Sequence, residues 1–386
     1  MKVRYENVLV SLDGHTEGFV DLRSHLPRAY HDDFMTALAA GKAIFHKAEQ
    51  YYAALVKAGF DFSFEVDPDL DFDPERFDLK LTPQERLERT DADGVAAELI
   101  IDGFGAVSDD PGLAHQISLA YNRWFADTYL ATAPDRFRGV VVVNMIAGVD
   151  TVIDEIRDAH AHGLSGIHLP GIPATADRDL PHYNHEMYEP LWRTLDEFGM
   201  LAIFHASIGR EKPRWRMDGS QRAALALELM DINHSHETAV APLLLAGVPE
   251  RYPAIRFGWI ESGCTWVPAI LDACDMYFHG SVDHPAHRLE MKPTEQWRQS
   301  CFTAGPITKA DVATRDRVGI ETICFGSDFI HVEGTYPHSR RRLTDVLADL
   351  TPEERYAICT SNGARILDLD LERLAGTRAA EEVWAY

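Results

Sequence analysis

Positive charge is scarce in this chain of 386 residues. Lysine and arginine together number 37, against 61 aspartate and glutamate residues, and the formal net charge is −24. A protein this acidic repels nucleic acid phosphates and anionic membrane surfaces, so we expect neither as a partner. An anionic substrate then needs a metal ion or a local group of basic residues to attract it.

Cysteine and long apolar runs are scarce as well. The five cysteines form no C-x-x-C pair, which predicts no disulfide framework and favours a reducing compartment. No stretch approaches the roughly 20 apolar residues of a membrane span, and the polar start of the chain lacks the apolar core of a signal peptide. Hydrophobic residues still make up 46% of the chain, enough for a sizeable core. We therefore expect a cytoplasmic globular protein.

Short apolar runs alternate with amphipathic stretches of helical length. Several runs are apolar at consecutive positions, as strands buried on both faces are. The runs are Val8–Leu12, Val95–Ile101, Gly139–Asn144, Gly166–Leu169, Leu201–Phe204, Ile255–Ile260, Ser300–Thr303 and Thr322–Phe325. Strand and helix repeated about eight times predict an α/β fold with parallel strands, either a (β/α)₈ TIM barrel or a doubly wound open sheet.

Two insertions and a tail interrupt this repeat. We expect one domain over residues 1–370, with insertions at about 19–88 and 206–236 that follow the first and fifth runs, and a peripheral tail at 371–386. Long insertions in compact domains are usually lids or binding loops. The second insertion begins with a basic segment, in which Arg210 is a candidate for binding a substrate carboxylate. A solvated loop is the alternative reading of that segment.

Polar residues that suit a metal ion follow three of the predicted strands. Asp13 and His15 end the first run, His205 follows the fifth and Asp328 follows the eighth. Each residue taken alone has an ordinary structural explanation, such as a core histidine or a helix cap. In a parallel barrel, however, the C-terminal ends of the strands converge on one mouth. Two imidazoles and two carboxylates suit Zn²⁺, Mn²⁺ or Fe²⁺, and we predict one such ion here.

Other candidates lie at the same strand ends. Glu261 follows the sixth run and is either an acid/base group or a helix cap. His331 and His338 come shortly after Asp328, and histidine beside a metal ion is a natural proton carrier at neutral pH. Trp266 is a candidate wall for a planar substrate, with packing in the core as the alternative.

In this order, the motifs resemble those of the amidohydrolase-related family, the branch of the amidohydrolase superfamily that includes metal-dependent decarboxylases. The resemblance covers roughly Val8 to Leu369, and its most specific part is Gly-Ser-Asp-Phe-Ile-His with the following Glu-Gly-Thr-Tyr-Pro-His-Ser. It implies a (β/α)₈ barrel, a single divalent ion (usually Zn²⁺, sometimes Mn²⁺) and often a homodimer. It implies as metal ligands Asp13, His15, His205 and Asp328. Many members carry a catalytic histidine where this sequence has Glu261.

The resemblance favours non-oxidative decarboxylation of an aromatic or conjugated carboxylic acid. With the family's histidine absent, the proton donor is expected to be His331, His338 or a Glu261 with a raised pKa. Hydrolysis of an amide, ester or lactone uses the same ligands, with Asp328 taking a proton from water. A non-catalytic binding protein is a third possibility, for which a broken ligand set would be the sign.

Overall fold

The computed structural model forms an eight-stranded barrel of parallel strands. It describes residues 5, 7–16, 20–43, 81–101, 108–143, 145–173, 180–205, 237–281, 283, 288–331 and 334–381. The strand order follows the chain from β1 to β8, and every neighbouring pair is parallel. The strands are β1 Leu9–Ser11, β2 Val95–Ile101, β3 Phe137–Val142, β4 Gly166–Leu169, β5 Leu201–Phe204, β6 Arg256–Ile260, β7 Cys301–Gly305 and β8 Ile323–Phe325. The predicted TIM barrel is thus confirmed.

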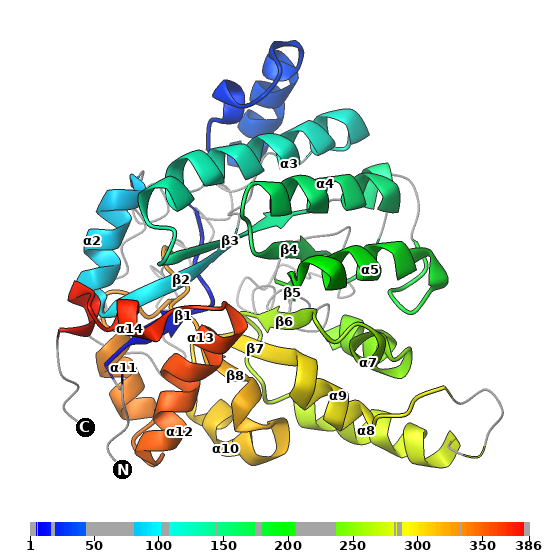
Figure 1. Cartoon of the computed structure of the whole chain (residues 1–386), viewed down its shortest axis with the longest axis vertical. Coiled ribbons are helices and arrows are strands. Elements are labelled where there is room, and N and C mark those ends of the chain that lie inside the picture. The colour runs from blue at the N-terminus through cyan, green and yellow to red at the C-terminus, as the bar shows by residue number, and fades with distance from the viewer. Residues whose placement is uncertain are drawn as a thin grey trace, which may run out of the picture.

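Helices surround the barrel, with short 3₁₀ and π segments between them (Figure 1). The helices that follow Thr308 and Thr351 begin with capping boxes, in which each threonine side chain accepts a backbone N–H. The helices are α2 Pro83–Asp93, α3 Pro111–Phe125, α4 Val149–Ala161, α5 Glu189–Phe198, α7 Val248–Arg251, α8 Val267–Ser281, α9 Pro293–Ser300, α10 Lys309–Val318, α11 Ser339–Val346, α12 Pro352–Tyr356, α13 Asn362–Ile366 and α14 Leu371–Leu374. Among the described residues, none is both long and apolar enough to cross a membrane.

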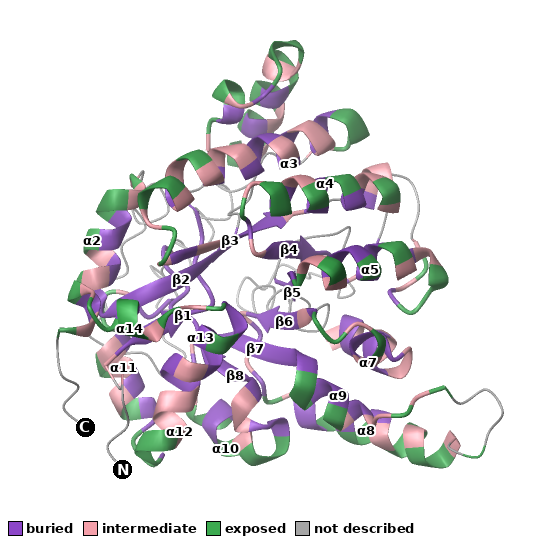
Figure 2. Ribbon diagram, in the orientation of Figure 1, coloured by how far each residue is buried: buried purple, intermediate pink, exposed green. Residues whose placement is uncertain are grey.

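Buried side chains form two separate layers, one inside the barrel and one between the barrel and its helices. Val10, Leu99 and Ile203 belong to the inner cluster, whereas Leu9 and Ile100, their neighbours along the chain, belong to the outer one. This alternation follows from the two faces of a strand. Because both faces are covered, the strands are almost entirely buried, while the outer sides of the helices are exposed (Figure 2).

The segment after residue 370, expected to be peripheral, packs beneath the barrel. Leu374 and Ala379 are each 1% exposed and belong to the inner cluster, together with Leu367. Arg138, near the start of β3, donates from Nε to the carbonyl oxygen of Leu367 at 3.0 Å. The described part of the tail therefore closes the N-terminal end of the barrel, opposite the end where active sites form.

Main-chain hydrogen bonds at and just beyond the C-terminal ends of β1 and β8 join the first strand to the last. Leu12 N donates to Phe325 O at 2.9 Å, and Asp328 N donates to Asp13 O at 2.8 Å. A Cβ at Gly326 would lie 2.3 Å from the Cβ of Asp13, so glycine is required for this close approach. The seam between β1 and β8 thus brings Asp13 and Asp328 together.

Candidate metal centre

The loops after β1, β5, β6 and β8 direct six polar side chains into one region of the barrel mouth. We call this group the carboxylate–imidazole cluster; its members are Asp13, His15, His205, Glu261, Asp328 and His331. Asp13 and Asp328 are 0% exposed, and His15 and His205 are 2% and 7% exposed. Glu261 and Asp328 both adopt positive φ angles, of 62° and 54°, a backbone conformation that is uncommon for residues other than glycine.

The two aspartates and His15 form the buried floor of the cluster. His15 Nε2 lies 3.4 Å from Asp13 Oδ1 and 3.2 Å from Asp328 Oδ1. Ser11 and Ser327 lock the two loops together, since Ser327 N donates to Ser11 Oγ at 2.9 Å. The floor is therefore fixed by main-chain and hydroxyl contacts as well as by its ionisable groups.

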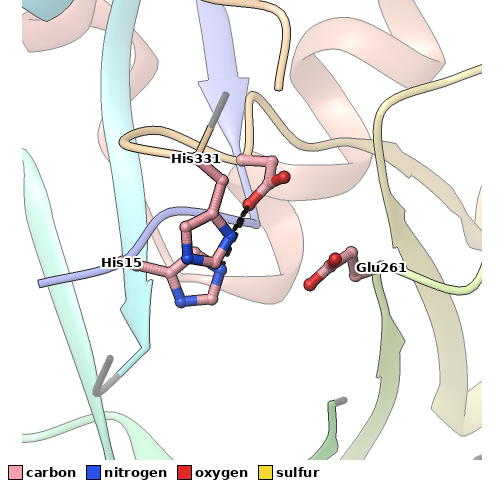
Figure 3. A group of neighbouring side chains, drawn as sticks. His15, Glu261 and His331 are labelled. Atoms are coloured by element: carbon pink, nitrogen blue, oxygen red, sulfur yellow. Dashed lines mark ion pairs between the residues drawn. The ribbon is translucent and has the colours of Figure 1, made fainter. Parts of the chain in front are cut away.

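Two further histidines and Glu261 complete the walls. His205 Nε2 lies 3.8 Å from Asp13 Oδ1 and 2.7 Å from Glu261 Oε2. His331 stacks on His15 with ring centroids 4.1 Å apart, and its Nδ1 lies 2.8 Å from Asp328 Oδ1. Figure 3 shows Glu261 facing His15 and His331 from the opposite side of the cluster.

The electrostatics of the two buried aspartates differ. Burial, and then the carboxylate of Asp328, raise the pKa of Asp13 well above its usual range. Burial would also raise the pKa of Asp328, but His331 and His15 hold it below the usual range. Burial, and then His331, lower the pKa of His15. Two carboxylates in one dry site repel each other, so the site favours added positive charge.

The donor set fits a divalent metal ion. Within the described part of the chain, both carboxylate oxygens of Asp13, both of Asp328 and Nε2 of His15 are buried without a hydrogen-bonding partner. Buried polar atoms are rarely left in this state unless a ligand or ion satisfies them. Ligand atoms of Asp13, His15 and His205 lie within 4.8 Å of one another, as do those of His15, Glu261, Asp328 and His331. The mixed nitrogen and oxygen donors suit Zn²⁺, Mn²⁺ or Fe²⁺.

Glu261 is ionised more readily than the sequence analysis expected. Burial and Asp328 would raise its pKa, but the imidazoles of His205 and His331 hold the pKa of Glu261 below its usual range. The expectation of a Glu261 with a raised pKa is therefore wrong. The physical reason is its direct contact with His205, which the sequence does not reveal.

The remaining predicted site residues lie in different places. His338 is exposed at the N-terminus of α11, and within the described residues it has no ion pair or ring contact with the cluster. Trp266 packs against Trp297, with ring centroids 6.2 Å apart, and donates from Nε1 to Ser262 O, so it contributes to the layer between barrel and helices. Arg210, like the whole insertion at 206–236, lies outside the described residues.

His168 was missed by the sequence analysis. It is 2% exposed on β4, its ring centroid lies 5.5 Å from that of His205, and its Nε2 is 3.3 Å from the carbonyl oxygen of His205. The available signal was a histidine inside the apolar run Gly166–Leu169. Such a position is unfavourable for a polar ring unless it has a partner.

Comparisons with known proteins agree with this architecture. The fold is similar to that of 5-carboxyvanillate decarboxylase LigW from Sphingomonas paucimobilis, with a TM-score of 0.64 and 16% identity over 94% of this chain and 99% of that one. It is also similar to a dihydroxybenzoic acid decarboxylase from Polaromonas sp. JS666 with bound manganese and the inhibitor 2-nitroresorcinol, with a TM-score of 0.61 and 14% identity over 94% and 97% of the two chains. A third similar structure is an amidohydrolase from Mycobacterium avium subsp. paratuberculosis, with a TM-score of 0.65 and 16% identity over 93% and 98%.

At the level of sequence, no curated protein matches the chain. The sequence model of the amidohydrolase family, however, matches residues 20–369. That range includes β2 to β8 and, within the cluster, His205, Glu261, Asp328 and His331. The chain therefore belongs to the amidohydrolase family.

Proposed function

We propose that the chain is a metal-dependent carboxy-lyase that removes CO₂ from an aromatic or conjugated carboxylic acid. The observation that carries the proposal is the carboxylate–imidazole cluster, with the unsatisfied oxygens of Asp13 and Asp328 at its floor. The similarity to two solved aromatic-acid decarboxylases supports the choice of reaction. A fold alone does not determine function, so the proposal depends on the chemistry of the site.

Four residues would hold one divalent ion: Asp13, His15, His205 and Asp328. Zn²⁺ is our first choice, with Mn²⁺ or Fe²⁺ as the other ions that these donors accept. When bound, the ion supplies positive charge that attracts and orients a substrate carboxylate in this acidic protein. The protein's own contribution is to exclude water from the floor of the site and to fix the orientation of the two imidazole ligands.

Decarboxylation requires one proton at the carbon that bears the carboxylate. The proton forms the new C–H bond, the bond to the carboxyl carbon breaks, its electron pair stays on the substrate, and CO₂ leaves. We assign the transfer to His331, because its ring stacks on that of His15 and its Nδ1 lies 2.8 Å from Asp328 Oδ1, which places the imidazole beside the proposed metal site. Glu261, whose pKa lies below its usual range, is an ionised carboxylate 2.7 Å from His205 Nε2.

Hydrolysis of an amide, ester or lactone is the second candidate. The lowered pKa of Glu261 and of Asp328 keeps both carboxylates ionised, which is the state that accepts a proton from an attacking water. The two reactions give different products from different substrates. A parallel screen of carboxylic acids for CO₂ release and of acyl compounds for hydrolysis therefore distinguishes them.

The metal proposal is tested by elemental analysis of the purified protein beside the variant His205→Ala. We expect about one Zn or Mn per chain in the wild type and a marked loss in the variant. The variant His338→Ala is the matched control, because this histidine is exposed and outside the cluster. A wild type without metal that also gains no stability from added Zn²⁺ or Mn²⁺ would contradict the proposal.

The proton carrier is tested with His331→Gln and His338→Gln. Because general acid–base catalysis typically contributes about 10²–10⁴-fold to a rate, His331→Gln should lower kcat for CO₂ release by a factor in that range. His338→Gln should retain the wild-type rate. Equal rates for wild type and a folded, metal-loaded His331→Gln would remove His331 from this role.

A further inference from the structure

Arg86 is a fully buried charge next to the loops that carry the metal ligands. It lies on α2 and is 0% exposed. Its Nε and Nη2 donate to the two carboxylate oxygens of Glu98, on β2, at 2.9 and 3.0 Å. This paired geometry neutralises the buried guanidinium and fixes its plane.

The same guanidinium contacts the main chain of two different loops. Nη1 donates to the carbonyl oxygen of His15 at 2.5 Å, and Nη2 lies 3.4 Å from the carbonyl oxygen of Phe329. The guanidinium carbon also lies 4.8 Å from the centroid of the Phe329 ring. Arg86 thus contacts His15, a proposed ligand after β1, and Phe329, the residue that follows the proposed ligand Asp328 after β8.

Arg86 acts where these loops already meet. His15 N donates to Phe329 O at 2.6 Å, and Ile101 N donates to Gly14 O at 2.7 Å. A Cβ at Gly14 would lie 2.9 Å from Arg86 Nη2, so the guanidinium is seated directly against the backbone between Asp13 and His15. An ion pair that served only to connect α2 to β2 would not need contacts with either loop.

We propose that Arg86 is a positioning residue of the metal centre, which sets the spacing between His15 and Asp328 by holding the carbonyl groups of His15 and Phe329. Glu98 supports it by fixing the guanidinium. The inference rests on the proposed metal site and adds a residue that binds neither the metal nor the substrate. Outer partners that orient metal ligands typically contribute about 10–100-fold to metal affinity.

The test compares three variants of the full-length protein. Arg86→Lys keeps the charge but loses the planar fork, and the double variant Arg86→Met with Glu98→Met removes both charges without leaving one unpaired. Arg136→Lys is the matched control. Its guanidinium also binds a carbonyl oxygen, that of Ala96, at 2.7 Å and the carboxylate of Asp91 at 2.6 Å, but at the N-terminal end of β2.

The readouts are the Kd for Zn²⁺ after chelation, the thermal midpoint, and the visible absorption spectrum of the Co²⁺-loaded protein. Both Arg86 variants should bind Zn²⁺ roughly 10–100-fold more weakly and change the Co²⁺ spectrum, whereas Arg136→Lys should keep the wild-type values even where its midpoint falls. Wild-type Zn²⁺ affinity in the folded double variant would overturn the inference, as would equal weakening by Arg136→Lys. A wild type that binds no metal would instead refute the proposed site itself.

Discussion

A buried carboxyl group makes the stability of the segment after β8 dependent on pH. Asp93, at the end of α2, is 5% exposed. Its Oδ1 accepts the backbone N–H of Ser339 at 2.9 Å and its Oδ2 accepts the hydroxyl of the same residue. Ser339 in turn contacts Thr335, whose N–H donates to Ser327 O at 2.8 Å, next to Asp328. Asp93 therefore anchors the loop that carries His331.

Burial raises the pKa of Asp93 from 3.8 to about 7. Between these values the folded chain keeps a proton that the unfolded chain has lost, so the free energy of unfolding decreases as pH rises through this window. At about 1.36 kcal/mol per pKa unit, the total effect is about 4 kcal/mol, of which about 2.5 kcal/mol falls between pH 5 and pH 8. Asn in place of Asp93 keeps an acceptor for the N–H of Ser339 and a donor for its hydroxyl oxygen, but it does not titrate.

The assay is urea unfolding of the wild type and Asp93→Asn at a series of pH values from 5 to 8. The variant should gain stability relative to the wild type as pH rises, by about 2.5 kcal/mol over this range. The comparison at each pH cancels the titration of groups common to both proteins. Parallel stability curves for the two proteins would refute the reasoning, since they would mean that Asp93 titrates alike in the folded and unfolded chains.

Three further outcomes are expected. A Cβ at Gly139 would lie 2.3 Å from Cε1 of Phe125. The variant Gly139→Ala should therefore lower the free energy of unfolding by about 1–3 kcal/mol. An unchanged urea midpoint would contradict this packing. The five cysteines are buried, and burial raises the pKa of Cys274 to about 11 and of Cys324 to about 12. A thiol reagent at pH 8 should therefore label the native protein slowly and the unfolded protein at five sites. Rapid labelling of the native protein would show that the thiols are accessible. Removal of the metal by a chelator should lower the thermal midpoint. Zn²⁺ at 100 times its Kd should then raise the free energy of unfolding by about 2.7 kcal/mol. A thermal midpoint that does not respond to metal would count against the site.

The strands were predictable because they are buried on both faces, whereas the choice of a closed barrel over an open sheet came from the family resemblance. The predicted run Val95–Ile101 coincides with β2, and the fourth and fifth runs coincide with β4 and β5. The meeting of Asp13, His205 and Asp328 was predictable for a related reason, since parallel strands in a closed barrel direct their C-terminal ends to one mouth. The strand positions follow from periodicity, which a single sequence contains, and the meeting of the ligands follows once the barrel is assumed.

Features that depend on local backbone turns were not predictable. At Asp328 the chain turns with a φ of 54°, and His331 N then donates to Asp328 O at 2.8 Å, which returns the ring of His331 to the cluster and leaves His338 outside. Arg86 and Glu98 were also overlooked. Arg86 is a charged residue in a helical stretch and Glu98 one in a strand, as many exposed residues are. Only the packing of α2 against β2 shows that both are buried.

The seam between β1 and β8 has a consequence for how the protein matures. Three of the four proposed ligands, Asp13, His15 and Asp328, lie on the first and last strand ends, and main-chain hydrogen bonds join these loops. Contacts between the two ends of a long chain form late, because they need the closure of almost the entire loop of intervening sequence. During synthesis, a nascent chain that lacks β8 has Asp13 and His15 but no partner loop to complete the site. Metal acquisition should therefore report closure of the barrel by β8, and we expect it to follow the folding of the first strands.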